Sequence, residues 1–236
     1  MKLSAAFLLF TIAASTTLRA ADITGVITFK GTPPKEIPLT VMENSPDCMA
    51  MHKEVPTTHH WVVGPNGEFA NVTVYLKTAD GEEITGKSTG ASAAPAVLDQ
   101  KGCLYTPQII AIQTGQKLIV KNSDPCIHNV HSVSNAGNPD HNDAQMSGAP
   151  DLSYTFDKPE MYLTFRCDVH PWMFAWVSVF DSPYFSVSDT AGKFTIKNVP
   201  PGKYTVVASH RKAGEQTQTV EVADKDVTVN FTFEAK

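Results

Sequence analysis

The chain has 236 residues, of which 42% are hydrophobic, and its 19 Lys and Arg against 24 Asp and Glu give a formal net charge of −5. The hydrophobic content is normal for a globular chain, and the length fits one large or two small domains. The acidic balance excludes a typical nucleic-acid-binding protein, which needs a basic surface. It favours contact with a positively charged partner instead.

Residues 1–20 have the pattern of a secretory signal peptide. Lys2 precedes an apolar run at 5–14, and Ala20 offers a small residue at the cleavage position. This run is too short to span a bilayer, and no later segment is apolar for long enough to do so. Removal of Lys2 and Arg19 leaves 17 basic residues (19 − 2) against 24 acidic ones. We therefore expect a soluble periplasmic or secreted protein that is cleaved after Ala20.

Residues 21–95 form an N-terminal β region. The segment 23–29 is strand-like, and 71–76 alternates apolar and polar residues as a half-buried strand does. Between them, 43–60 has no regular pattern. Residues 81–95 are rich in Gly, Ser, Thr and Ala, which is typical of a linker or long loop.

Residues 96–182 form a second β region. Two apolar segments, 108–112 and 117–120, flank a turn at Thr114–Gly115, and this arrangement predicts a hairpin. The segment 134–151 is polar and contains several Gly and Pro, so it is expected to be a loop.

The most informative pattern is Cys-x2-His-x2-Met, formed by Cys167, His170 and Met173 between strand-like segments at 161–165 and 175–180. It places a thiolate, an imidazole and a thioether within seven residues. Soft sulfur ligands favour Cu(I), and imidazole suits both copper states. The two strands are expected to hold the ends of the loop rigidly while the loop exposes His170.

A further histidine, His128, lies upstream in the segment Asn122–Val130. Two imidazoles and one thiolate with a weak axial methionine are the ligands of a blue-copper site. These motifs resemble the cupredoxin family, in the short-loop form of amicyanin-like proteins, over residues 96–181. The resemblance implies a Greek-key β-sandwich that binds one copper ion, cycling between Cu(I) and Cu(II). In it, the trigonal plane would be formed by His128, Cys167 and His170, with Met173 as the axial ligand.

The same resemblance implies functions for three neighbouring residues. Asn129 would join the two ligand loops through hydrogen bonds. Asp168 stands where the family often has Ser or Thr, and its carboxylate would favour the oxidised, more positive metal; a solvated loop Asp is the other interpretation. Protein redox partners would dock on an apolar patch near His170 and Trp172, unless Trp172 packs inward as part of the core.

Two other interpretations of the motif remain open. Cys167 could be a buried structural thiol, with Met173 filling the core, because free cysteine is among the most buried residue types. Alternatively, His128, Cys167 and His170 could hold zinc with an open fourth position. The methionine argues against zinc, which seldom uses a thioether.

Four cysteines in an exported chain also indicate a disulfide. We favour Cys48–Cys103, because both follow polar, turn-like residues outside the proposed metal loop. This bridge would close a loop of 55 residues (103 − 48) and stabilise the protein by about 4 kcal/mol in the chain-entropy model. Cys103–Cys126 is the alternative, since Cys126 precedes His128 by two residues and a bridge there could constrain the ligand loop.

Residues 183–236 carry a second resemblance. The segments 188–196 and 199–206 look like the end of a carboxypeptidase regulatory-like (transthyretin-like) β-sandwich. The region is short for a complete sandwich, and isolated strands need partners to bury a face. We therefore expect the strands at 23–29 and 71–76 to complete it, with the copper domain inserted; a small separate N-terminal extension is the alternative.

The sequence thus predicts an all-β protein with a cupredoxin-like sandwich and a second, smaller sandwich. Its predicted function is that of an exported mononuclear type 1 copper protein, a one-electron carrier between periplasmic partners. We expect no enzyme, because no Ser-His-Asp set, carboxylate pair or phosphate loop stands out. Two alternatives are a copper-handling protein or enzyme with an open copper site, and a non-catalytic module that binds carbohydrate or protein through the regulatory-like segment.

Overall fold

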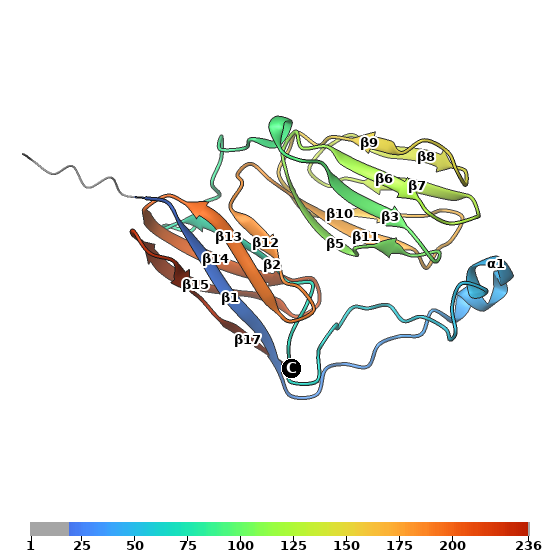
Figure 1. Cartoon of the computed structure of the whole chain (residues 1–236), viewed down its shortest axis with the longest axis horizontal. Coiled ribbons are helices and arrows are strands. Elements are labelled where there is room, and N and C mark those ends of the chain that lie inside the picture. Colours follow the sequence, from blue (N-terminus) through green and yellow to red (C-terminus); the bar gives the residue numbers. More distant parts are fainter. Residues whose placement is uncertain (1–18, 236) are drawn as a thin grey trace, which may run out of the picture.

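The computed structural model describes residues 19–235, which fold into two β-sandwiches with separate buried cores (Figure 1). The predicted all-β fold class is confirmed. Within the described part of the chain, no helix is long and apolar enough to cross a membrane. Residues 1–18 of the expected signal peptide lie outside the described residues.

The first sandwich, here called the terminal sandwich, is built from strands near both ends of the chain. Its strands are β1 (Ala21–Lys30), β2 (Thr73–Thr78), β12 (Phe185–Val187), β13 (Lys193–Val199), β14 (Gly202–His210), β15 (Gly214–Val222), β16 (Val227–Thr228) and β17 (Phe231–Glu234). In one sheet β1 pairs with β13, β16 and β17, and the other sheet has the order β12-β2-β14-β15. Each sheet thus contains one strand from the N-terminal region.

The second sandwich, here called the central sandwich, lies between these strands in sequence. Its strands are β3 (Ala96–Gln100), β4 (Tyr105–Thr106), β5 (Ile109–Gln113), β6 (Leu118–Asn122), β7 (His128–Val133), β8 (His141–Gln145), β9 (Leu152–Tyr154), β10 (Glu160–Arg166) and β11 (Phe174–Phe180). One sheet has the order β5-β11-β10-β7-β8 and the other β4-β3-β6-β9. The sheets enclose an apolar core that also contains Cys167 and Met173.

The expected hairpin at Thr114–Gly115 is wrong. Strands β5 and β6, on either side of this turn, belong to different sheets of the central sandwich. The backbone N–H of Thr114 donates to the carbonyl of Phe180, and that of Gly115 to the carbonyl of Phe156. Because these groups bond to other segments, the chain crosses from one sheet to the other at this point.

Two segments expected to be irregular contain regular structure. The polar segment 134–151 includes β8, which pairs with β7 at the edge of its sheet. An edge strand keeps one side open to solvent, so it can be polar. The segment 43–60 includes the end of a 3-10 helix (Thr40–Asn44) and the one-turn helix α1 (Pro46–Met49). Residues 81–95 contain a short 3-10 turn (Gly90–Ser92) and an isolated β-bridge from Glu83 to Lys77, in keeping with the expected loop.

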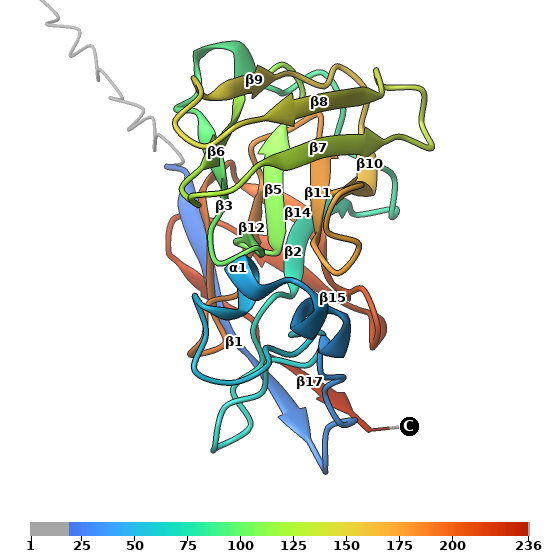
Figure 2. The ribbon, with the colours of Figure 1, turned by 90° about the vertical axis from the view of Figure 1, so that its right-hand side faces the viewer.

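Residues 31–60, here called the strap, leave the terminal sandwich after β1 and reach the central sandwich (Figure 1, Figure 2). Met42 is fully buried and joins the core of the central sandwich. The imidazole Nε2 of His52 lies 2.7 Å from the carbonyl oxygen of Gly102. A disulfide between Cys48 of α1 and Cys103 fixes the strap covalently, with 5.6 Å between the Cα atoms.

Candidate metal centre

Three strands of one sheet position the candidate ligands. His128 is the first residue of β7, and Cys167 directly follows β10. Strand β10 pairs with β7 on one side and with β11, which begins just after Met173, on the other. The loop between β10 and β11 is closed by backbone hydrogen bonds from Cys167 N to Met173 O (3.3 Å) and from Met173 N to His170 O (2.9 Å). Both ends of the ligand loop are therefore held by the sheet.

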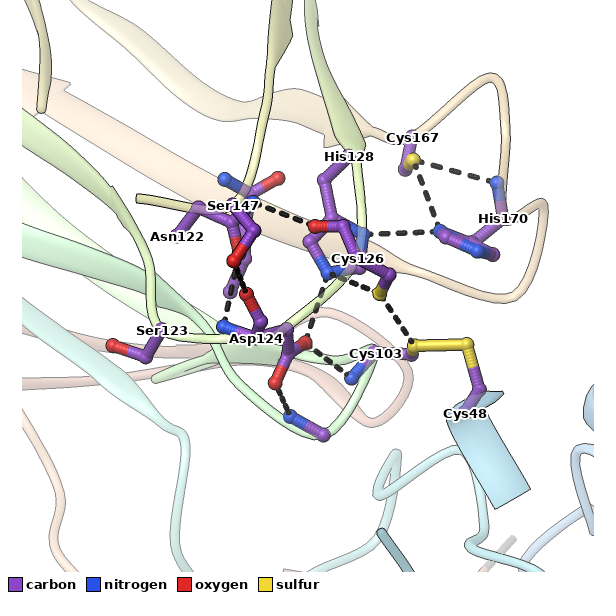
Figure 3. A network of polar contacts seen from close by, with 12 residues as sticks. Cys48, Cys103, Asn122, Ser123, Asp124, Cys126, His128, Ser147, Cys167 and His170 are labelled. Atoms are coloured by element: carbon purple, nitrogen blue, oxygen red, sulfur yellow. Dashed lines mark hydrogen bonds and ion pairs between the residues drawn. A yellow bond between two sulfur atoms is a disulfide. The ribbon is translucent and has the colours of Figure 1, made fainter. Parts of the chain in front are cut away.

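The two histidines and the cysteine predicted from the sequence converge in one buried site (Figure 3). The Nδ1 atoms of His128 and His170 are 3.0 Å apart, and Cys167 Sγ lies 3.7 Å from His170 Nδ1. One donor atom from each residue lies within 4.8 Å of the others. All three residues are buried. Two imidazole nitrogens and one sulfur are thus directed at a common point.

The surroundings of Cys167 favour its thiolate form. Burial by itself opposes ionisation, but hydrogen bonds from the His128 and His170 rings lower the pKa of the thiol to about 6. The backbone N–H groups of Asn129 and His170 also donate to the sulfur, each at 3.3 Å. The thiolate is the form of cysteine that binds metals. Cys167 is therefore prepared for a metal at neutral pH.

A buried carboxylate holds the far side of the His128 ring. Asp124 Oδ2 lies 2.8 Å from His128 Nε2, and both side chains are almost fully buried. Asp124 also accepts hydrogen bonds from the backbone N–H groups of Gly102 and Cys103, at 2.6 and 2.7 Å. Burial opposes its ionisation, but these bonds and that from His128 keep the pKa of Asp124 below its ordinary value.

This pair fixes the orientation of His128. With Nε2 protonated and donating to Asp124, the Nδ1 lone pair of His128 remains available to a metal. Burial opposes a second proton on the ring, yet the hydrogen bonds to Asp124 and Cys167 raise the pKa of His128. The sequence motifs did not indicate Asp124 as part of the site. The one feature of the sequence that could have indicated it is the position of this acidic residue four residues before the candidate ligand His128.

Asn129 connects the two ligand segments. Its side-chain oxygen accepts the backbone N–H of Asp168 at 3.1 Å, and its side-chain nitrogen donates to Asn142 at 2.6 Å. Its own backbone N–H donates to Cys167 Sγ. The Asp168 carboxylate is part of the exposed surface, where it contacts His131 Nδ1 at 2.7 Å and Arg166 Nε at 3.3 Å. The Asp168 carboxylate is therefore engaged by His131 and Arg166 at the surface.

Met173 is fully buried in the core of the central sandwich, in the same cluster as Cys167 and Trp172. Its backbone closes the ligand loop, as described above. The structure thus places Met173 within the loop that carries two of the candidate ligands, with its side chain directed into the protein interior.

The expected exposure of His170 is wrong, and of the two interpretations of Trp172 the structure shows inward packing rather than an exposed patch. The two residues are only 8% and 9% exposed. The strap covers His170, since the sulfur of Cys48 lies within 4.8 Å of a ring nitrogen of His170, as does that of its bonded partner Cys103. Trp172 packs inward, and its Nε1 donates to the carbonyl of Cys103 at 3.1 Å. The exposed apolar side chains next to the ligands in sequence are Ile127 and Val169.

The remaining thiol lies beside the disulfide. Cys126 is free and half-buried. Its Sγ is 3.8 Å from Cys103 Sγ and 3.7 Å from His128 Nε2 (Figure 3). Burial and the nearby Asp124 charge raise the pKa of the Cys126 thiol. The surroundings of Cys126 therefore disfavour its thiolate form, whereas those of Cys167 favour it.

Comparison with known proteins finds both resemblances that the sequence predicted. Residues 170–234 match the family model of the carboxypeptidase regulatory-like domain. This match starts within the ligand loop, but the strands of the terminal sandwich in this range begin at β12. No curated protein matches the chain.

The similar solved structures include copper proteins. They include a Cu-containing nitrite reductase (NirK) from Thermus scotoductus SA-01, at 17% identity and TM-score 0.35, with 43% of this chain and 26% of the reductase covered. A methionine-to-alanine mutant of amicyanin in its Cu(I) form is 20% identical with TM-score 0.32, covering 46% of this chain and 98% of amicyanin. A purple cupredoxin from Nitrosopumilus maritimus is 21% identical with TM-score 0.31, covering 36% and 98%.

Proposed function

We propose that this chain is an exported copper protein that binds one ion and carries one electron at a time between protein partners. The observation that carries the proposal is the buried convergence of His128 Nδ1, His170 Nδ1 and Cys167 Sγ. Bound copper would supply a Cu(I)/Cu(II) couple. The chain's contribution is to orient the donors and to limit access of water.

The donor set fits copper in its chemistry. Soft sulfur suits Cu(I), and imidazole suits both oxidation states. The lowered pKa of Cys167 supplies the thiolate, and Asp124 holds His128 with Nδ1 available. Met173 is proposed to hold copper weakly through its thioether, because it belongs to the same short loop as Cys167 and His170. A thioether is an unusual ligand for zinc, so the set favours copper over zinc.

Burial of the site favours a carrier over an enzyme. A substrate needs an open position at the metal, but His128, Cys167 and His170 are all buried. The nearby cleft of about 570 Å³ is lined by Trp172 and Phe174 but by none of the three donors. A rigid, enclosed ligand set suits electron transfer, in which only the charge of the metal changes. We therefore propose that the chain is not an enzyme.

A second candidate is copper handling, in which the protein stores or delivers the ion. The Cys126 thiol, 3.7 Å from His128 Nε2, favours this alternative because it offers a further soft sulfur beside the site. A handling site would hold Cu(I) without a reversible couple, whereas a carrier site would hold both oxidation states.

The proposed docking surface for a redox partner lies beside the ligands. The partner would approach over Val169 and Ile127, the exposed apolar residues adjacent to His170 and His128 in sequence.

The secretory pattern of residues 1–20 supports export to the periplasm or beyond the cell. Carbohydrate or protein binding by the terminal sandwich is proposed only on the resemblance of residues 170–234 to the regulatory-like family.

Metal analysis and voltammetry of the exported protein test the proposal together. A carrier is expected to contain one copper per chain and to show one reversible one-electron couple. One copper without a reversible couple would support handling instead. Stoichiometric zinc, or no metal after loading with either ion, would reject both candidates.

A further inference from the structure

Three cysteine sulfurs lie close together at the contact between the strap and the central sandwich. Cys48 and Cys103 are bonded, and the free Cys126 Sγ is 3.8 Å from Cys103 Sγ (Figure 3). Cys48 and Cys103 are both fully buried, whereas Cys126 is half-buried. A thiol from solvent therefore cannot easily reach the bridge, but Cys126 already touches one of its sulfurs.

We propose that these cysteines form an internal thiol–disulfide exchange centre that controls how tightly the strap covers the metal site. Cys126 attacks Cys103, a Cys103–Cys126 bond forms, and the Cys48–Cys103 bond breaks. The proposal stands on the sulfur positions alone and does not depend on the identity of the metal.

The exchange is balanced without an external oxidant or reductant. The Cys126 sulfur forms a bond to Cys103 as the Cys103–Cys48 bond breaks, and the proton released from Cys126 is taken up, through water, by the departing Cys48 sulfur. One disulfide and one thiol are present before and after the step. Cys103 is the sulfur attacked, because it is the one in contact with Cys126.

The surroundings of the three residues determine which part moves. Cys103 is held to the central sandwich, since its N–H donates to Asp124 and its carbonyl accepts from Trp172. Cys48, in contrast, belongs to α1, a helix of only four residues in the strap. When the bond to Cys103 breaks, the strap is therefore the part that loosens.

Loosening of α1 would uncover His170. Cys48 Sγ lies within 4.8 Å of a His170 ring nitrogen, so this part of the strap shields the ring. The strap would stay attached elsewhere, because Met42 is buried in the core and His52 contacts Gly102. The exchange is thus expected to open the region around His170 without releasing the whole strap.

Disulfide mapping tests the exchange directly. Purified apoprotein is incubated without reductant in mildly alkaline buffer, quenched with acid, digested with pepsin and analysed by mass spectrometry. We expect peptides linked through Cys48–Cys103 and, in smaller amount, through Cys103–Cys126. The linked Cys103–Cys126 peptide should persist in C167S and be absent from C126S. Its absence from the wild-type protein after prolonged incubation would overturn the proposal.

Limited proteolysis tests the effect on the strap. Lys53 is exposed and lies just beyond α1. In C48S, oxidation should join Cys103 to Cys126, and tryptic cleavage after Lys53 should be several-fold faster than in C126S, where the original bridge is retained. Equal cleavage rates in C48S and C126S would show that the bridge does not control the strap.

Discussion

Asp124 and His128 form a buried pair, with 2.8 Å between the carboxylate Oδ2 and the imidazole Nε2, and the opposite side of the same imidazole faces His170. This relationship links the loop before β7 to the candidate metal centre. A carboxylate that bonds the outer nitrogen of a ligand histidine fixes its tautomer and strengthens its basicity. Asp124 is therefore expected to act on the metal through His128.

Removal of the Asp124 charge should weaken copper binding. We expect D124N to lower copper affinity by about 10–100-fold, the usual effect of removing such a partner. The reduction potential of the bound copper should also rise, because a negative charge that favours Cu(II) is lost. Competition titration with a chelator measures the first effect and voltammetry the second.

D168N is the matched control for this variant. It removes the same charge from the ligand region, but from an exposed carboxylate paired with His131 and Arg166. Its copper affinity should stay close to that of the wild-type protein. Equal losses of affinity in D124N and D168N would show that net charge, rather than the contact with His128, is responsible.

The Cys167 thiol should ionise at unusually low pH in the apoprotein. Burial opposes ionisation, but the hydrogen bonds from His128, His170 and two backbone N–H groups lower the pKa to about 6. The ultraviolet absorption of thiolate in C126S should therefore develop around this pH. In C126S/C167S the signal should vanish, whereas a midpoint near 8.5, the value of a free cysteine, would contradict the hydrogen-bonding account.

His210 should make the terminal sandwich sensitive to mild acid. The ring is buried against Phe69, and its Nδ1 accepts the backbone N–H of Ala213 at 3.1 Å. Burial is the main reason that the pKa of His210 falls to about 4. The unfolded chain binds a proton near the ordinary histidine value, so this contribution to stability is complete above that value and is lost as pH falls toward 4.

We expect the free energy of unfolding to fall by about 2 kcal/mol between pH 7 and pH 5 through His210 alone. Urea denaturation of H210F should show a smaller decrease over the same range, even if the variant is less stable at neutral pH. H59Q, which changes an exposed histidine, should retain the decrease. An unchanged slope in H210F would assign the acid sensitivity to other groups.

The disulfide should contribute strongly to stability because it closes a loop of 55 residues. The chain-entropy model predicts a loss of about 4 kcal/mol when it is removed. C126A provides the reference state, and C48A/C126A removes the bridge without allowing Cys103 to pair with Cys126. Urea unfolding of the two apoproteins should differ by this amount, and a difference below about 1 kcal/mol would argue against a constrained unfolded chain.

Sequence patterns predicted much of the fold because the informative residues repeat with the period of a strand. Residues 23–29 are rich in β-branched and aromatic side chains, which favour a strand, and β1 buries every second residue. The same patterns could not separate a hairpin from a crossing between sheets at Thr114–Gly115, since strand pairing depends on distant partners. Edge strand β8 was missed because its polar composition resembles that of a loop.

At the candidate site, the local motif predicted which residues would meet but not what would cover them. Cys167, His170 and Met173 share one loop, so their spacing carries the information. The burial of His170 depends on the strap, which is joined to the site by Cys48 from more than a hundred residues away in sequence. The contact between Asp124 and His128 likewise depends on how the chain bends before β7.

The visible spectrum of copper-loaded protein tests the central claim most directly. If Cys167 thiolate binds Cu(II) beside His128 and His170, the wild-type protein and C126S should both show an intense sulfur-to-copper charge-transfer band. C167S should lose this band, because a hydroxyl is a harder and far less acidic donor. If C167S binds copper with an unchanged spectrum, Cys167 is not a ligand and the electron-carrier account is wrong.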